Sequence, residues 1–239
     1  MKDQNNGSLK AQGIVEYALI LALIVGVVFL SLQAMGTSVG EVFCLVLDGL
    51  NFPSQYCNSA YCESSFDSMD GWESAAGYGW EVRDGQLCNT SNPSRGYLFN
   101  QCSMENLPDD YTVRLNGATL DTGDGYGIFF RLQNYDDKPN GYAFQYDAGY
   151  GGGAYVVRKW VNGYEINPPI VANRLQGYDW HDSSRDVELQ VQGDTFTAFV
   201  DGEEVMTFTD LNYESGGVGL RTWDRTAVCM DDFSIEPLR

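Results

Sequence analysis

The sequence predicts an α+β chain that is mainly β, with a long N-terminal α-helix followed by an antiparallel β-sandwich. Residues 18–32 carry no charge and are almost all aliphatic, which predicts the helix. After Leu50 the chain becomes rich in Gly, Tyr and Asp, and apolar and polar residues alternate over short segments. Many short strands separated by turn residues are typical of a sandwich or a barrel.

The first element is a polar leader at residues 1–11, which runs directly into the apolar segment. A secretory signal would have its cleavage site after the apolar stretch, so any cleavage here would leave that stretch in the mature protein. One carboxylate, Glu16, precedes the uncharged run and is followed by Tyr17. A charge costs about 2.5–3.5 kcal/mol near the bilayer centre and less near the interface, so Glu16 needs a partner.

The run VEYALILAL resembles the N-terminus of Flp (Tad, type IVb) pilins, over about residues 8–50. The resemblance implies cleavage by a prepilin peptidase between Ala11 and Gln12, which places Glu16 fifth in the mature chain. The family usually has Gly where this chain has Ala11, and cleavage after Gly13 would place Glu16 third. The freed amino group of Gln12 in a neighbouring subunit would neutralise Glu16 during assembly.

The same resemblance implies a structural subunit of a bacterial surface filament. The helix would lie in the inner membrane before assembly and in the core of a homopolymer afterwards, built by the pilus assembly machinery. The alternative is a single-span membrane anchor, because the apolar run is barely long enough to cross a bilayer.

The segment 12–50 is expected to form the helix, which would run from about Gln12 to Asp48 with a length of about 55 Å. Apolar residues continue at helical spacing beyond the uncharged run, and Gly49 is a candidate C-terminal cap. Residues 51–62 contain Pro53 and read as a neck, and residues 63–239 form the predicted sandwich.

The clearest strands lie within residues 185–209, where two hairpin turns, Gly193-Asp194 and Asp201-Gly202, separate alternating segments. Further strands are predicted near residues 80–87, 97–100, 111–120, 126–133, 142–146, 154–161, 218–222 and 228–235.

The strings SSFDSMDGW, WEVRDGQL, GYGIFFRLQN, GYAFQYD and MDDFSIEPL resemble the concanavalin A-like (laminin G-like) jelly roll over residues 61–239. The resemblance implies the fold more than the function, because this sandwich hosts binding modules, enzymes and scaffolds.

The chain contains six cysteines, and an even number in an exported protein favours disulfides. The spacing does not decide which cysteines pair, and zinc is disfavoured because there is no CxxC pair and only one histidine. The disulfide candidates are Cys44, Cys57, Cys62, Cys88, Cys102 and Cys229.

The net charge of −19 excludes a nucleic-acid partner, since phosphates require a basic surface. It also predicts a soluble, self-repelling exterior that favours neutral or calcium-bridged ligands over anionic ones. Calcium is a possible cofactor, and Asp231 with Asp232 is the favoured pair among several acidic turns.

No enzyme is predicted. His181 could serve as a base only if the fold brought a serine and an acid to it, and the ExDxxE strand of similar jelly-roll glycosidases is absent.

A glycan-binding face has better support. The chain has 15 Tyr and 5 Trp, whose rings stack on sugars, and Arg and Gln groups can bind hydroxyls. Strand alternation should collect several of these side chains on one sheet face, unless they are ordinary strand residues or subunit contacts. An anchored carbohydrate-binding or, less favoured, glycoside-hydrolase-like surface protein is therefore the alternative to a pilin. The proposed binding residues are Arg131, Gln145, Arg158, Trp160, Arg221 and Trp223.

Overall fold

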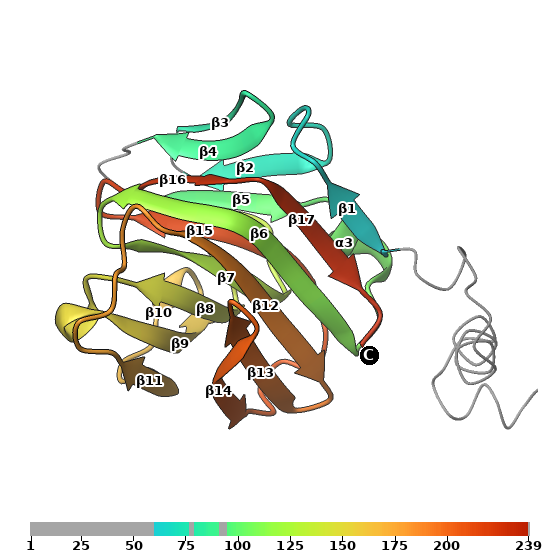
Figure 1. Ribbon diagram of the computed structural model, residues 1–239. Helices are drawn as coiled ribbons and strands as arrows, with labels where there is room; N and C mark the ends of the chain where they lie inside the picture. The colour runs from blue at the N-terminus through green and yellow to red at the C-terminus, as the bar shows by residue number, and fades with distance from the viewer. Residues whose placement is uncertain (1–59, 77–78, 91–94, 239) are drawn as a thin grey trace, which may run out of the picture. The chain divides into compact units, whose positions relative to one another are not determined.

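Two antiparallel sheets packed face to face make up the part of the chain that the computed structural model describes, residues 60–76, 79–90 and 95–238 (Figure 1). The sequence-based predictions for the leader, the helix at 12–50, most of the neck, Cys44 and Cys57 lie outside these residues. Among the described residues, no helix is long and apolar enough to cross a membrane.

Sheet A has nine strands among the described residues, in the order β14-β13-β12-β6-β16-β4-β3, and β17 pairs with both β6 and β1. Its strands are β1 (Cys62–Ser64), β3 (Trp80–Arg83), β4 (Gln86–Thr90), β6 (Tyr111–Thr122), β12 (Ser184–Gln192), β13 (Thr195–Val200), β14 (Glu203–Thr209), β16 (Ala227–Met230) and β17 (Asp232–Glu236).

Sheet B has eight strands in the same part of the chain, in the order β10-β9-β8-β7-β15-β5-β2, with β11 also paired to β9. Its strands are β2 (Trp72–Ala76), β5 (Gly96–Asn100), β7 (Gly125–Leu132), β8 (Gly141–Asp147), β9 (Ala154–Val161), β10 (Tyr164–Glu165), β11 (Val171–Arg174) and β15 (Gly217–Trp223). A short helix, α3 (Cys102–Asn106), follows β5, and a 3-10 turn, η1 (Tyr150–Gly152), joins β8 to β9.

The predicted antiparallel sandwich is confirmed, and most predicted strands are present within a few residues of their expected bounds. The segment at 80–87 is a hairpin rather than one strand, because Asp84 and Gly85 both have positive φ, as a tight turn requires. The segment at 228–235 is divided at Asp231, whose backbone N–H donates to the carbonyl oxygen of Asn116. Strands β1, β2, β10 and β11 and helix α3 were not predicted.

The core between the sheets is rich in aromatic rings. Phe196 lies 5.2 Å from Phe130 and 5.0 Å from Phe208 between ring centroids, and Trp72 packs edge-on against Phe233 at 4.9 Å. The strands of sheet A that meet this core alternate between buried and more exposed residues, as in β13. In contrast, every residue of β7 and β8 is buried, so sheet B is covered on both of its faces.

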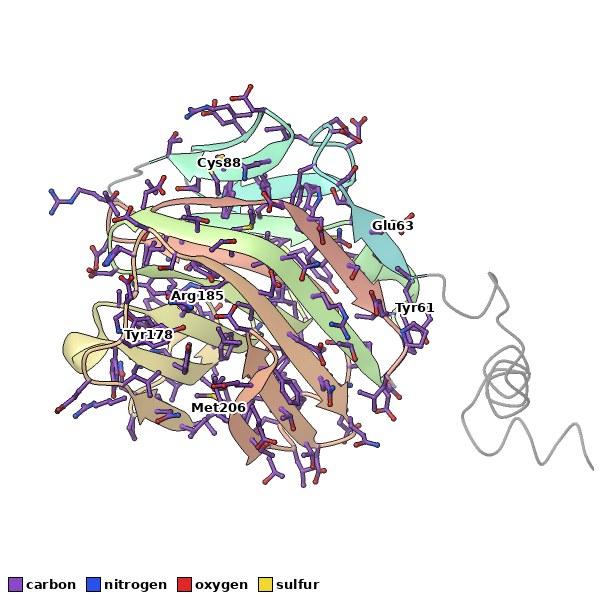
Figure 2. The ribbon with its side chains drawn as sticks, in the orientation of Figure 1. Tyr61, Glu63, Cys88, Tyr178, Arg185 and Met206 are labelled. Atoms are coloured by element: carbon purple, nitrogen blue, oxygen red, sulfur yellow. A yellow bond between two sulfur atoms is a disulfide. The ribbon has the colours of Figure 1, made fainter. Side chains whose placement is uncertain are left out.

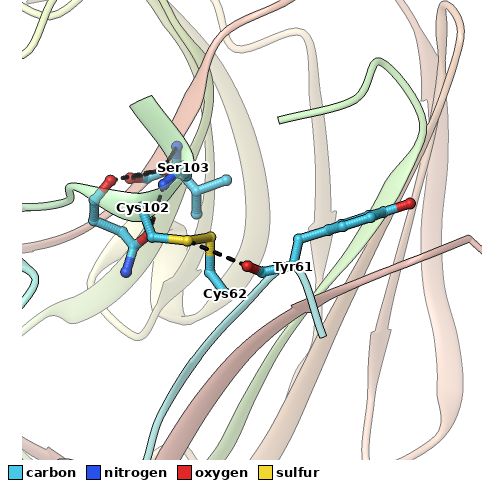
Figure 3. The surroundings of a disulfide bond; sticks show 6 residues. Tyr61, Cys62, Cys102 and Ser103 are labelled. Atoms are coloured by element: carbon cyan, nitrogen blue, oxygen red, sulfur yellow. Dashed lines mark hydrogen bonds between the residues drawn. A yellow bond between two sulfur atoms is a disulfide. The ribbon is translucent and has the colours of Figure 1, made fainter. Parts of the chain in front are cut away.

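All four described cysteines form disulfides, Cys62–Cys102 and Cys88–Cys229. The first joins β1 to α3 (Figure 3), where the Ser103 hydroxyl donates to the carbonyl oxygen of Asn100 and accepts the Val218 N–H. The second links β4 to β16, which are paired with Cys88 directly opposite Cys229. Both disulfides therefore fasten neighbouring elements that lie far apart in the sequence.

Replacing both cysteines of the Cys88–Cys229 pair with alanine should lower the free energy of unfolding by about 3–5 kcal/mol, and removing Cys62–Cys102 should cost about 1 kcal/mol less. The reason is the conformational entropy that each disulfide removes from the unfolded chain, which is larger for a longer loop. The paired cysteines are separated by 141 residues in Cys88–Cys229 and by 40 in Cys62–Cys102. Guanidinium unfolding followed by tryptophan fluorescence measures both, since all five Trp lie between residues 72 and 223. An equal or reversed order of the two losses would contradict the entropic account.

Candidate functional site

The face of sheet B that points away from sheet A, here called the outer face, carries its own layer of aromatic and polar side chains. Tyr97, Phe99, Phe129 and Trp160 form a cluster separate from the core between the sheets. The strand register places Arg221 opposite Gly127, and Gly127 opposite Gln145. Arg158 lies opposite Ala143, one row along the same face.

Small residues at the centre of the outer face make room for this layer. A Cβ added at Gly127 would lie 3.3 Å from Cγ of Arg221 and 2.5 Å from the carbonyl oxygen of Phe144. A Cβ at Gly125 would lie 3.0 Å from the ring of Trp223. The Arg221 stem and the Trp223 ring therefore lie flat on the strand backbone, a close approach that glycine permits.

Arg221 is held between two indole rings. Its guanidinium carbon lies 4.5 Å from the ring centroid of Trp160 and 4.4 Å from that of Trp223. Trp160 in turn packs edge-on against Tyr97 and Phe129. Because stacking fixes the plane of the guanidinium, its donors point in set directions, which suits the recognition of planar polar groups.

Glu165 connects the polar side chains of the outer face. The short strand β10 pairs Glu165 with Trp160, which brings the carboxylate over this face. One of its oxygens accepts from Arg221 Nη1 at 2.5 Å and from Gln145 Nε2 at 3.1 Å, and the other lies 3.2 Å from Arg158 Nε. Arg158 also donates to the side-chain oxygen of Asn167 at 2.7 Å.

Asp147 is a second carboxylate of the outer face and is 7% exposed. Burial raises the pKa of Asp147 to about 6, against the opposing effects of the Tyr150 N–H and of the nearby Arg221 and Arg158. The Tyr150 N–H donates to its Oδ1 at 2.9 Å, and the Tyr150 ring stacks beneath both Arg158 and Arg174. Asp147 therefore changes charge close to neutral pH beside two buried cations.

The structure brings together five of the six predicted binding residues. Gln145, Arg158, Trp160, Arg221 and Trp223 share the outer face. Trp160 is buried under neighbouring side chains of the domain itself, and Trp223 is half-buried.

The sixth predicted residue, Arg131, does not lie on the outer face. Two residues of β7, Phe130 and Arg131, oppose the single residue Val218 of β15, which makes a bulge, and Arg131 has a φ of 53°. The bulge reverses the alternation, so the fully buried guanidinium lies over the Phe196 ring and donates to the carbonyl oxygens of Asp109 and Gly193. The prediction for Arg131 was wrong for this reason.

Glu165 and Asp147 were missed by the sequence analysis. The signal for Glu165 was present, because Asn162 and Gly163 both have positive φ and Asn-Gly is a strong hairpin signal. Asp147 has no comparable signal, since only the finished sheet shows that its carboxylate is buried beside two arginines.

The acidic pair predicted for calcium, Asp231 and Asp232, follows β16, and the first and last strands do meet, as β1 pairs with β17. Their carboxylates accept hydrogen bonds from amides, Asp231 from Gln86 at 2.5 Å and Asp232 from Asn116 at 2.7 Å. Across the residues that the structure describes, no three His, Cys, Asp or Glu side chains gather to hold a metal.

Nε2 of His181 is hydrogen-bonded to the backbone carbonyl oxygen of Gly123, at 2.9 Å. The nearby Ser183 hydroxyl donates to Asp179 rather than to the histidine.

Two open depressions lie elsewhere on the domain. One, of about 610 Å³, is lined by residues 63–68, by Asp70 and by Asp232–Ser234 of β17. The other, of about 480 Å³, is lined in part by the stacked pair Tyr178 and Arg185 (Figure 2). Neither is lined by a residue named above on the outer face. The outer face is the better candidate because its buried charged groups converge on one carboxylate.

Replacing Asp147 with asparagine should stabilise the protein above pH 6. The raised pKa means that ionisation favours the unfolded chain, so this group lowers stability as pH rises from about 4 to 6 and the loss is complete above that. Asn keeps an acceptor for the Tyr150 N–H, so we expect a gain on the order of 2–3 kcal/mol at pH 7.5 that vanishes near pH 4. Guanidinium unfolding at the two pH values measures it, with the exposed Asp194→Asn as control, and a pH-independent difference would contradict this assignment.

Several solved structures share the fold of this domain. The B. subtilis carbohydrate-binding module CBM66 is 23% identical and superposes with a TM-score of 0.58 over 70% of this chain and 95% of that one. The carbohydrate recognition domain of Emp47p is 13% identical, with a TM-score of 0.59 over 77% and 99%. The exoplasmic/lumenal domain of VIP36 in its Ca²⁺/Man3GlcNAc-bound form is 10% identical, with a TM-score of 0.58 over 76% and 91%.

These likenesses show the fold alone, an antiparallel jelly-roll sandwich. No curated protein matches the chain. The family model of the 3-keto-alpha-glucoside-1,2-lyase-like domain matches residues 62–236, which is nearly all of the described domain and most of the sequence. The chain therefore belongs to the family of 3-keto-alpha-glucoside-1,2-lyase-like domains.

Proposed function

We propose that this chain is a structural subunit of a type IV, Tad/Flp-like pilus whose β-sandwich is displayed outside the filament and binds glycans. The glycan site is the outer face of sheet B. The observation that carries this part is Arg221 clamped between Trp160 and Trp223 beside Gln145 and Arg158. Aromatic rings with fixed planar donors are the groups that recognise sugar rings and their hydroxyls.

The names of similar proteins support a sugar ligand. CBM66 is a carbohydrate-binding module, the Emp47p domain is a carbohydrate recognition domain, and the family takes its name from a glucoside lyase. Partly exposed aromatic rings, Tyr150 and Trp223, lie at the edge of the polar cluster and give a sugar ring a surface to reach.

We propose binding rather than catalysis for this domain. Glu165 is engaged by two guanidinium groups and an amide, and Asp147 accepts a backbone N–H. Glu165 is therefore not free to act as acid or nucleophile in this arrangement. An assay for release of reducing sugar from bound glycans separates this from the glycoside-hydrolase-like alternative.

The filament part of the proposal rests on the leader, Glu16 and the uncharged run at 18–32. It places the protein on the bacterial surface after a prepilin peptidase removes the leader. The competing class is a carbohydrate-binding protein anchored by a single span, which would be displayed on the surface without forming filaments.

Replacing Arg221 with lysine should weaken glycan binding at least ten-fold. Lysine keeps the charge but loses the flat group that stacks between the two indoles. The measurement is a glycan array followed by calorimetry on the full chain in mild detergent, with and without calcium.

The control for that experiment is Arg114→Lys, because Arg114 pairs with Glu188 and Glu236 on sheet A, away from the outer face. Equal affinity of Arg221→Lys and wild type would contradict the assignment of the site. Absence of any glycan binding by the wild type would reject the binding function.

Replacing Glu16 with alanine should abolish surface filaments without changing the fold of the β-sandwich. The lone carboxylate beside an apolar run is expected to pair with the amino group of Gln12 in the next subunit, and alanine removes that pair. Electron microscopy of cells counts the filaments, and tryptophan fluorescence of the purified chain reports on the sandwich. Glu41→Ala is the matched control. Normal filaments in the Glu16 variant would reject the proposed role of Glu16, whereas absence of filaments in the wild type would leave the anchored alternative.

A further inference from the structure

The outer face of sheet B gathers cations in a strongly acidic domain. Residues 51–239 hold 29 acidic and 12 basic residues. Four arginines nevertheless stack on the aromatic rings of this one face: Arg221 on Trp160 and Trp223, Arg158 and Arg174 on Tyr150, and Arg95 on Tyr97.

Two of these cations, Arg158 and Arg221, are buried. Their side chains are 8% and 4% exposed. The Nε atom of Arg221 is buried and has no hydrogen-bond partner, so a donor remains unused inside the cluster. A buried guanidinium is costly unless anions satisfy it.

The group that satisfies both arginines is the carboxylate of Glu165, which uses one oxygen for each. Glu165 differs from its partners in being reachable, because its side chain is 29% exposed. It stands on a strand of only two residues at the edge of the sheet, held there by hydrogen bonds such as Ile166 N–H to the Lys159 carbonyl oxygen. Its rotation toward solvent would break two ion pairs and the hydrogen bond from Gln145, and it would leave two fixed guanidinium groups without a carboxylate.

From this geometry we infer that the glycan site takes an acidic sugar, a uronate, whose carboxylate replaces that of Glu165 between Arg158 and Arg221. The inference rests on the glycan-binding function proposed above and names its ligand class. The two arginines already hold a carboxylate with one oxygen each, so the exchange preserves the number of ion pairs. The sugar ring would then lie against Trp223 or Tyr150, the half-buried rings beside the cluster.

The overall negative charge does not oppose this choice at short range. Interactions between exposed charges are screened beyond about 8 Å at physiological ionic strength. The groups that would contact the ligand carboxylate are local: Arg158 and Arg221, the two cations that Glu165 bridges. The net charge led us to expect neutral or calcium-bridged ligands in preference to anionic ones. For a small ligand at this face, the local cations favour an anion instead.

The test compares trigalacturonate with its fully methyl-esterified form, in which each carboxylate is replaced by a neutral methyl ester. The full chain in mild detergent should bind the acid at least ten-fold more tightly than the ester by calorimetry. Replacing Glu165 with glutamine removes the internal competitor, so the affinity for trigalacturonate should rise several-fold. Glu188→Gln is the matched control, since Glu188 also pairs with an arginine, Arg114, but on sheet A.

Equal binding of acid and ester, or unchanged or weaker acid binding by Glu165→Gln, would overturn the inference. If that variant does not fold, as its thermal unfolding would show, the preference of the wild type for acid over ester decides alone. Binding of neutral or sulfated glycans without trigalacturonate would reject the uronate and leave the glycan-binding function standing. Failure to bind any glycan would reject both.

Discussion

Sheet B is buried on both faces, and the rest of the domain depends on this constraint. One face packs on sheet A, and every residue of β7 and β8 is buried. An ordinary antiparallel sheet in a two-layer sandwich exposes its outer face, as β12 and β13 do through their alternation. The outer face must therefore supply its own cover, and the aromatic and arginine layer provides it.

This constraint explains why the composition of the central strands is unusual. A layer that lies flat on a sheet needs small residues beneath it, and Gly125, Gly127 and Ala143 stand at those positions. It also explains the use of arginine instead of lysine, because a guanidinium can be buried between rings while its edges still find acceptors. Glu165 and Asp147 supply acceptor charge, and burial holds the pKa of Asp147 near 6.

The part of the fold that could be predicted from the sequence is the part governed by alternation and by short turns. In β12 to β14 the pattern of Val187, Leu189 and Val191, followed by Asp201-Gly202, fixed both the strands and their sidedness. The central strands of sheet B are buried on both faces, so their residues do not alternate between apolar and polar. These strands could be located, but Arg131, which lies at a bulge, was assigned to the wrong face. Cysteine pairing also escaped prediction, since Cys88 meets Cys229 only because β4 and β16 are neighbours in the folded sheet.

The first strand of the described domain is connected to the strand that carries the cation cluster through helix α3. The described chain begins beside β1, which pairs with the last strand, β17, and is fastened to α3 by Cys62–Cys102. Helix α3 contacts the first residues of β15, where the Val218 N–H donates to the Ser103 hydroxyl. Arg221 and Trp223 stand three and five residues further along β15, about 10–17 Å at the rise of an extended strand. The cation cluster therefore lies further along β15 than the point where α3 contacts that strand.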